Sequence, residues 1–369
     1  MKKQLESSPL DTSSLKVSGE SVILAHIQRL TPYLPPLEGR NPKDNLLLDF
    51  NEKVDVMPAS IRNALHDYID SGRLQTYPSY SDTTELLADY VGVESSQILL
   101  TNGSDQGIEL VFRSCCQAGD EVIIPSPTFA MYKQCAAVQA LKVHAPLYEK
   151  KAGFPLQQVL TAINKSTKLI VLANPNNPCG TALEPDTILR IANAAPHAAI
   201  LVDECYFEYT QKTVATSCLN YPNLFVTRTF SKTWGMPSLR FGYLVSHPQN
   251  IQSITCVRGP YDINQLAVVA ARAALNNRSD VDAYVNEVMQ VSKPLLESFL
   301  QSKHVSFWKS EANYLWAFFD NPESVAEQLA LNGILVRPKQ DSLGKTGLRI
   351  TLGNRRHTQQ LIEALDELI

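Results

Sequence analysis

Four polar segments of the chain contain residue types that could do chemistry. They are Thr101–Gly107 (TNGSDQG), Ala173–Gly180 (ANPNNPCG), Asp203–Tyr206 (DECY) and Thr229–Lys232 (TFSK), and Arg240 lies eight residues beyond the lysine. Each segment follows a short apolar run that predicts a strand. Ligands of open α/β sheets bind at the carboxyl ends of the strands, so we expect the four segments to meet at one edge of a sheet.

Each segment has an ordinary structural explanation when it is taken singly, such as a helix cap, a turn or a solvated lysine. Taken together, the residue types suit pyridoxal phosphate. The amine of Lys232 can form a Schiff base with the aldehyde of this cofactor. Asp203 can pair with the pyridine nitrogen and keep the ring an electron sink. The helix that is expected to begin in Thr101–Gly107 can bind the phosphate, with Arg240 as a second cation.

Composition and missing motifs exclude several other classes of protein. The 33 basic and 37 acidic residues leave a net charge of -4, which does not indicate a nucleic-acid or membrane partner. Seven cysteines without a CxxC motif argue against a disulfide framework and a zinc ribbon, and we expect no metal site. No dinucleotide-binding GxGxxG motif follows a predicted strand. The N-terminus lacks a secretory apolar segment and the apolar runs are too short to span a bilayer, so we expect a cytoplasmic protein.

Apolar runs and amphipathic stretches alternate between residues 94 and 246. The runs are Gln97–Thr101, Glu121–Ile124, Lys142–Ala145, Lys168–Ala173, Ala198–Asp203, Leu224–Arg228 and Phe241–Ser246. The helical patterns between them are Gln106–Cys116, Phe129–Val138, Leu156–Ile163 and Pro185–Ala194. This alternation predicts an α/β fold with a mainly parallel seven-stranded sheet that is flanked by helices. The continuous apolar runs are typical of strands buried on both faces.

A smaller α+β domain is expected at the C-terminal end of the chain. The expected elements are a helical region over Asn264–Ser302, strands Asn313–Phe319, Ile334–Arg337 and Gly347–Leu352, and helices over Pro322–Asn332 and from His357. At the N-terminus we expect a polar arm, a short helix over Ser21–Leu30 and an irregular, proline-rich segment over Thr31–Asn45. We therefore predict an N-terminal arm (residues 1–45) packing with the small domain, a large cofactor-binding domain (46–255) and the small domain (256–369).

The motifs NPNNPCG, DECYFEY, TFSK and LRFGY, in this order and spacing, resemble those of the fold-type-I pyridoxal-phosphate aminotransferases of class I/II. The chain is most similar to the histidinol-phosphate aminotransferases, and the resemblance runs from about residue 31 to the C-terminus. It implies transamination from L-histidinol phosphate to 2-oxoglutarate in histidine biosynthesis. An aromatic aminotransferase acting on phenylalanine or tyrosine, a decarboxylase of a phosphorylated amino acid such as phosphothreonine, and a non-catalytic cofactor-binding module are the alternatives.

The resemblance implies a role for each residue that matches a family motif. Lys232 would carry the cofactor and move the catalytic proton, and Asp203 would pair with the pyridine nitrogen. The remaining cofactor contacts would be Tyr206 and Asn177 at the ring oxygen O3′, Phe129 stacked on the ring, and Ser104, Asp105, Ser231 and Arg240 at the phosphate. Tyr77, in QTYPSY, matches a tyrosine that reaches the phosphate in a neighbouring subunit, which implies a homodimer with shared active sites.

The resemblance also implies a set of substrate-binding residues. Arg349, in GLRITLG, matches an arginine that binds the substrate carboxylate through its planar fork. Arg337 and Tyr33 match residues that meet the substrate phosphate in the histidinol-phosphate enzymes. Asn51 matches a residue near the substrate, but the Lys53–Asp55 segment that follows departs from the family's Asn-Pro and glycine pattern.

Overall fold

The computed structural model describes residues 21–369, which fall into two units, residues 21–32 and 33–369. In the first unit only the short 3-10 helix η2 (Ile27–Arg29) forms, so the helix predicted over Ser21–Leu30 is largely absent. The segment Thr31–Asn45 contains no helix or strand, as its prolines predict. The polar arm predicted for the first 20 residues lies outside the described residues, and its packing with the small domain stays a prediction.

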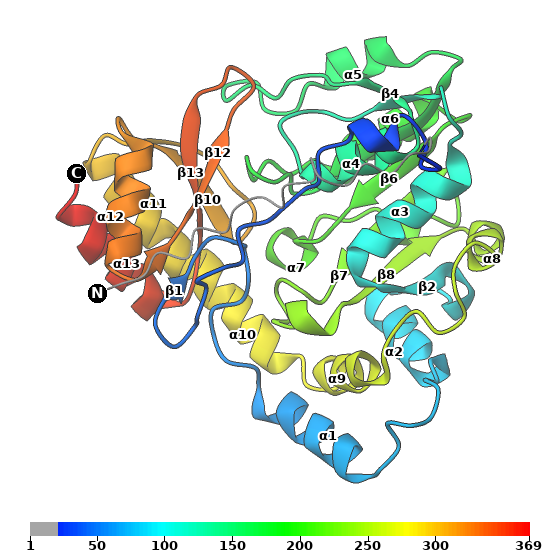
Figure 1. Ribbon diagram of the computed structural model, residues 1–369, viewed down its shortest axis with the longest axis horizontal. Coiled ribbons are helices and arrows are strands. Elements are labelled where there is room, and N and C mark those ends of the chain that lie inside the picture. Colours follow the sequence, from blue (N-terminus) through cyan, green and yellow to red (C-terminus); the bar gives the residue numbers. More distant parts are fainter. Residues whose placement is uncertain (1–20) are drawn as a thin grey trace. The chain divides into compact units, whose positions relative to one another are not determined.

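A seven-stranded sheet forms the centre of residues 33–369 (Figure 1). Its strands are β2 (Ile98–Asn102), β3 (Glu121–Ile123), β4 (Lys142–His144), β5 (Thr167–Ala173), β6 (Ala199–Asp203), β7 (Leu224–Thr229) and β8 (Phe241–Ser246). The strand order is β2-β8-β7-β6-β5-β3-β4, and only β8 runs antiparallel to its neighbours. Each predicted strand of this sheet forms within one residue of its expected bounds, so the mainly parallel α/β sheet is confirmed.

Helices cover both faces of this sheet. One face carries α3 (Gly103–Cys115), α4 (Ala130–Val138) and α8 (Pro248–Thr255); the other carries α2 (Ser81–Val91), α5 (Leu156–Ala162), α6 (Pro185–Ala194) and α9 (Gln265–Leu275). Side chains alternate along each strand. Leu201 of β6 therefore belongs to the same core cluster as Ile108 of α3, whereas Ile200 belongs to the cluster that contains Ile188 of α6. Both faces of the strands are apolar because both are covered.

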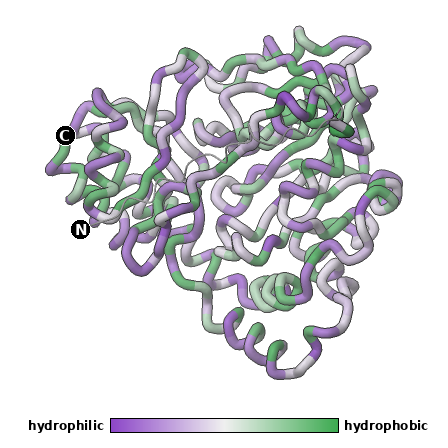
Figure 2. Tube along the Cα trace, in the orientation of Figure 1, coloured by the Kyte–Doolittle hydropathy of each residue, from purple (hydrophilic) through white to green (hydrophobic). Residues whose placement is uncertain are grey.

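Several smaller elements connect these layers. They are α1 (Ala59–Asp70), which packs on α9, and the short helices η3 (Ser95–Gln97), α7 (Phe207–Thr210), η4 (Ala215–Ser217) and η5 (Pro237–Leu239). Polar and apolar positions alternate along α1 in Figure 2, as expected for a helix with one exposed face. None of the helices in residues 21–369 is long and apolar enough to cross a membrane.

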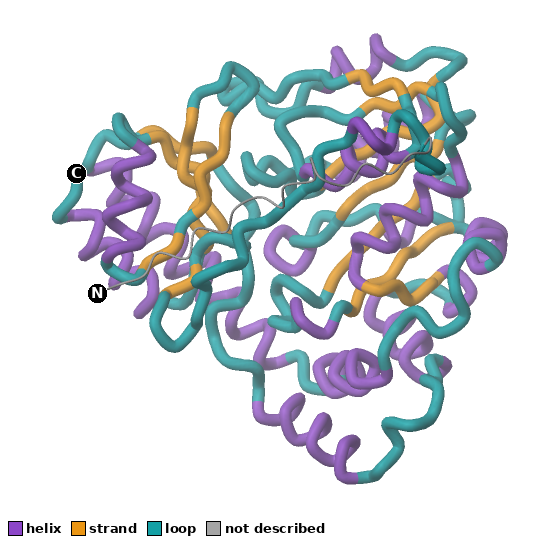
Figure 3. The backbone as a smooth tube through the Cα atoms, in the orientation of Figure 1, coloured by secondary structure: helices purple, strands orange, loops and turns teal. Residues whose placement is uncertain are grey.

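The C-terminal part of the chain forms a four-stranded antiparallel sheet in the order β12-β13-β10-β9 (Figure 3). Its strands are β9 (Ser306–Trp308), β10 (Tyr314–Phe318), β12 (Arg337–Gln340) and β13 (Thr346–Thr351). Its helices are α10 (Ser279–Glu287), the π-helical turn η6 (Val288–Ser292), α11 (Lys293–Ser302), α12 (Pro322–Leu331) and α13 (Arg355–Asp366). β1 (Leu46–Leu47) pairs in parallel with β11 (Ile334–Leu335), which brings residues near 46 beside this unit.

The helical region predicted over Asn264–Ser302 contains a break at Asn276 and Asn277, two poor helix formers. α9 precedes the break, and its apolar side chains join the core of the seven-stranded sheet. The run α10–η6–α11 follows the break: Val281 of α10 still packs in the core of the large sheet, whereas Val288 and Leu296 belong to the core of the smaller sheet. These contacts favour a domain boundary within α10, and the predicted boundary at residues 255 and 256 stays a prediction.

Candidate active site

The polar segments meet at one edge of the seven-stranded sheet. Asp203 is the last residue of β6, and Lys232 lies in the loop that follows β7. Gly103 begins α3 directly after β2. Because β8 runs antiparallel to β7, its first residue lies at the same edge of the sheet as the last residue of β7. Arg240, which directly precedes β8, therefore lies near the other polar segments.

A cavity of about 190 Å³ opens between these segments. It is lined by Phe50, Glu52, Ser104, Asp105, Phe129, Tyr132, Ala173, Pro175, Asn177, Asp203, Cys205, Tyr206, Thr229, Ser231, Lys232, Pro237 and Arg240. All the predicted cofactor residues line this first cavity except Tyr77. The Tyr77 side chain is 76% exposed, and its ring stacks on Tyr261 with 4.1 Å between the centroids.

Lys232 is held with its amine in the cavity. Its Nζ donates a hydrogen bond to the carbonyl oxygen of Phe50 at 2.9 Å. Burial lowers the pKa of Lys232, and the nearby Arg349 guanidinium lowers it further. A lysine with a lowered pKa is more often neutral near pH 7, which makes it both a nucleophile and a proton acceptor.

Asp203 is buried and is oriented by two donors. The hydroxyl of Tyr132 donates to Oδ2 at 2.5 Å, and the backbone N–H of Cys205 donates to Oδ1 at 3.2 Å. Burial raises the pKa of Asp203, and these hydrogen bonds oppose that shift because they stabilise the carboxylate. A cationic ring nitrogen in the cavity would stabilise the charged form further. The sequence interpretation missed Tyr132, since nothing in PSPTFAMY distinguishes its hydroxyl from that of any core tyrosine.

Tyr206 and Asn177 both present hydrogen-bond donors to the cavity. The Tyr206 oxygen accepts a hydrogen bond from Asn51 Nδ2 at 2.9 Å, which leaves its own O–H free to donate. The Asn177 Oδ1 accepts from Arg349 Nη1 at 2.7 Å, which leaves its NH₂ group for an acceptor. Burial raises the pKa of Tyr206, so the hydroxyl keeps its proton. Two donors converging in this way suit a phenolate oxygen.

The opposite end of the cavity is shaped for an anion. No side chain caps the N-terminus of α3, so its first backbone N–H groups are available to a ligand. Gly103 has a φ of +70°, and a Cβ placed there would lie 2.6 Å from Nη2 of Arg240. That nitrogen also donates to Asp105 Oδ2 at 3.0 Å. A Cβ on Gly242 would lie 2.7 Å from the backbone nitrogen of Ser104, so this glycine allows β8 to approach the helix start.

A second cavity of about 130 Å³ adjoins the first and shares Phe50, Phe129, Asn177 and Lys232 with it. Its other lining residues are Tyr33, Pro127, Thr128, Ala130, Pro178, Arg337, Lys339, Gln340 and Arg349. Three predicted substrate residues, Tyr33, Arg337 and Arg349, thus lie together beside Lys232. Within residues 21–369, no Asp or Glu lines the second cavity. Lys339, which also lines this cavity, was not among the substrate-binding residues predicted from the sequence.

Asn51, the fourth predicted substrate residue, lines neither cavity. It is fully buried and has a φ of 57°, in the left-handed region. Its backbone N–H donates to Thr351 Oγ1 at 3.0 Å, while its side chain donates to the Tyr206 hydroxyl. Asn51 therefore holds the Tyr206 hydroxyl in place from outside the two cavities.

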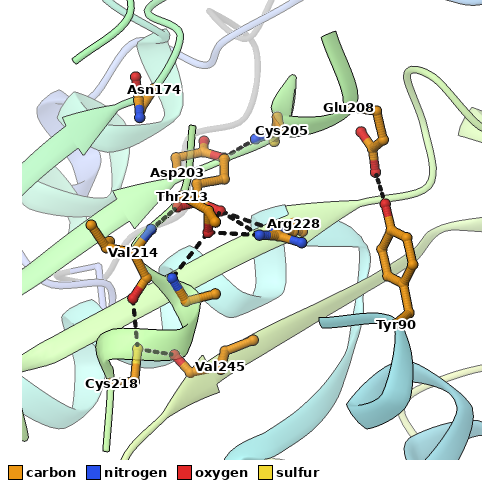
Figure 4. A network of polar contacts seen from close by, with 12 residues as sticks. Tyr90, Asn174, Asp203, Cys205, Glu208, Thr213, Val214, Cys218, Arg228 and Val245 are labelled. Carbon is orange, nitrogen blue, oxygen red and sulfur yellow. Dashed lines mark hydrogen bonds and ion pairs between the residues drawn. The ribbon is translucent and has the colours of Figure 1, made fainter. Parts of the chain in front are cut away.

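A buried polar network supports the loops that carry these residues (Figure 4). Glu204 and Arg228 form an ion pair at 2.8 Å with both side chains almost completely buried. The carboxylate of Glu208 accepts hydrogen bonds from Thr233 at 3.0 Å and from Trp234 Nε1 at 2.9 Å, the two residues that follow Lys232. This network ties α7 to the lysine loop. Glu204 and Glu208, two of the three acids in the DECYFEY segment, were a sequence signal for it, since buried acids need partners.

Among residues 21–369, no group of three or more His, Cys, Asp or Glu side chains is placed to hold a metal ion. The charged groups at the two cavities are two lysines, three arginines and three carboxylates, which suit an organic anion.

The chain is similar in sequence to known aminotransferases. The family model described as aminotransferase class I and II matches residues 43–365. Histidinol-phosphate aminotransferase 2 of Hydrogenovibrio crunogenus is 34% identical over 364 residues, covering 94% of this chain and 96% of that protein.

Two solved structures share the fold at lower sequence identity. Histidinol-phosphate aminotransferase from Sinorhizobium meliloti, in complex with pyridoxal-5′-phosphate, has a TM-score of 0.84 at 22% identity, covering 95% of this chain and all of that one. L-threonine-O-3-phosphate decarboxylase from Porphyromonas gingivalis has a TM-score of 0.76 at 20% identity, covering 88% of this chain and 99% of that one. The fold is therefore common to enzymes with different reactions.

Proposed function

Since the chain belongs to the class I and II aminotransferases, we propose that it transfers the amino group of L-histidinol phosphate to 2-oxoglutarate, with pyridoxal phosphate as cofactor. The products are imidazole acetol phosphate and glutamate, and the reaction belongs to histidine biosynthesis. The observation that carries this proposal is the second cavity, where Arg337 and Arg349 lie beside Lys232 without an acidic lining residue. Such a cavity favours an amine donor that bears a strongly anionic group.

The first cavity fits pyridoxal phosphate. Lys232 would meet the aldehyde end, Asp203 the ring nitrogen, and Tyr206 with Asn177 the ring oxygen, while the α3 N-terminus would receive the phosphate. Phe129 lines both cavities and supplies an aromatic face for the ring. When bound, the cofactor supplies a carbonyl carbon that accepts the amino group and a ring that withdraws electrons from the substrate.

The residues of this chain perform the remaining tasks. Lys232 Nζ would take the proton from the carbon that bears the substrate's amino group, and the burial that lowers the pKa of Lys232 favours the neutral amine that this step needs. Asp203 holds a positive charge at the ring nitrogen, with Tyr132 fixing the direction of its carboxylate. Arg349 is oriented by Asn177 and by the Asp49 carbonyl, so its fork is positioned before an anion arrives.

The proposed reaction is tested by a spectral titration of the pyridoxal form without a keto acid. We expect L-histidinol phosphate to convert it to the pyridoxamine form, and 2-oxoglutarate to restore the starting spectrum with formation of glutamate. Conversion by phenylalanine in preference to the phosphate ester would instead assign an aromatic aminotransferase. Release of carbon dioxide from phosphothreonine without glutamate would assign a lyase, a reaction that the same fold supports in the decarboxylase relative.

We further propose a cytoplasmic homodimer with shared active sites. Tyr77 supports the shared sites because it lines neither cavity of its own chain and leaves most of its side chain exposed. The seven unpaired cysteines support a reducing compartment. Mixing the inactive Lys232→Ala and Tyr77→Ala variants tests the sharing. Subunit exchange should restore roughly a quarter of the wild-type activity, because half of the dimers would be hybrids with one intact site. No recovery after proven exchange would refute it.

A further inference from the structure

Two arginines lie directly opposite each other on neighbouring strands beside Lys232. In the antiparallel pair β12–β13, Arg337 is in register with Arg349, and both line the second cavity. Like charges directly opposite on one face of a sheet destabilise it. An anion bound in the cavity that both arginines line would offset this repulsion.

Lys339 adds a third positive charge to the same face. Side chains alternate along a strand, so Lys339 projects from β12 to the same side as Arg337, two residues away. Its partner in the register is Gly347, which has no side chain to fill or screen that face. Lys339 lines the second cavity and is only partly exposed.

None of these three cations has a carboxylate partner in residues 21–369. No salt bridge there involves Arg337, Lys339 or Arg349, and Lys339 Nζ makes no hydrogen bond with the described residues. Burial, together with Arg349 and Arg337, lowers the pKa of Lys339 to about 8. Partly buried cations without counter-ions are unfavourable unless a ligand supplies the negative charge.

We propose that Lys339 is a specificity-determining residue that binds the phosphate of the amine donor together with Arg337 and Arg349. The inference rests on the proposed function, because it concerns the phosphate end of that substrate. A phosphate ester dianion has three terminal oxygens and a larger charge than a carboxylate. Two arginine forks and one lysine ammonium match that charge more closely than they match the carboxylate of 2-oxoglutarate.

The test compares Lys339→Gln with wild-type holoenzyme in steady-state kinetics. The KM for L-histidinol phosphate should rise about tenfold, the effect expected for one charge-assisted hydrogen bond, while kcat changes less than about twofold. The KM for 2-oxoglutarate should change much less, and Lys339→Arg should restore most of the affinity for the phosphate ester. Lys345→Gln is the matched control, since it removes the same charge from an exposed position that lines neither cavity.

A calorimetric titration of each holoenzyme with inorganic phosphate separates this inference from the proposed function. Failure of the wild-type protein to convert L-histidinol phosphate would reject the proposed substrate, whereas the phosphate titration would still decide the role of Lys339. Weaker phosphate binding by Lys339→Gln than by Lys345→Gln supports that role. Equal phosphate affinity in the two variants, or an unchanged KM for an active phosphate donor, overturns it.

Discussion

Removal of one hydroxyl group behind Asp203 should weaken cofactor binding. The Tyr132 hydroxyl donates to Asp203 Oδ2 at 2.5 Å, and both residues are buried, at 1% and 4% exposure. A hydrogen bond to a charged group contributes about 1.5–3 kcal/mol, because its loss leaves the charge short of a partner. Tyr132→Phe keeps the ring and removes only this bond. We therefore expect pyridoxal phosphate to bind roughly 10- to 150-fold more weakly.

The pH dependence provides a second readout of the same change. Burial already raises the pKa of Asp203, and the hydrogen bond from Tyr132 opposes that shift. In Tyr132→Phe the pKa of Asp203 should rise further, so the carboxylate is protonated at a higher pH and its attraction for a cationic ring nitrogen is lost there. The acid limb of the cofactor-binding curve should therefore move to higher pH.

The assay is an absorbance titration of the apoprotein with pyridoxal phosphate over a pH series. Tyr148→Phe is the matched control, since Tyr148 is equally buried and its hydroxyl makes no hydrogen bond with residues 21–369. The control should bind the cofactor like the wild type. An unchanged dissociation constant and an unchanged acid limb in Tyr132→Phe would refute the orienting role of this hydroxyl.

Three further variants test other parts of the site. Lys232→Ala should keep the far-ultraviolet circular dichroism spectrum of the wild type but lose turnover, and near-normal turnover would remove Lys232 from its proposed role. Because Lys339 carries its charge below its lowered pKa of about 8 and loses it above, the KM for L-histidinol phosphate should rise between about pH 7 and pH 9. A Lys339→Gln series that shows the same rise would contradict this assignment. Arg228→Met leaves the buried Glu204 unpaired, so the free energy of unfolding in urea should fall by about 3–5 kcal/mol. A loss below about 1 kcal/mol would indicate that Glu204 is neutralised in another way.

The composition of short segments predicted the large sheet and the first cavity. Runs such as Leu169–Ala173 are apolar throughout, and only a strand covered on both faces buries every side chain of so short a run. Parallel strands bring their carboxyl ends to one edge, so Asp203 and the TFSK lysine had to approach each other once the strands were recognised. The resemblance then suggested the contacts around them.

Two residues of the site depended on contacts between segments far apart in the chain. Tyr132 meets Asp203 across 71 positions, and Asn51 meets Tyr206 across 155, so neither partner is visible in a local pattern. Asn51 was predicted to bind the substrate, and the sequence did not indicate that its side chain would instead donate a hydrogen bond to the Tyr206 hydroxyl. The Asn276–Asn277 break likewise separates α9 from α10, and only packing shows that α10 contributes Val281 to the core of the large sheet and Tyr284 to the core of the smaller one.

The sequence by itself determined where the strands of the large sheet begin and end, which residues suit pyridoxal phosphate, and which protein family the chain resembles. These conclusions depend only on residue types within short segments. Only the tertiary structure decided which cations share the second cavity. Lys339 gains its importance from the β12–β13 register, which places it on the face that carries Arg337 and Arg349. A shift of one residue in that register would move these charges to the opposite face, and register is set by pairing and burial across the sheet.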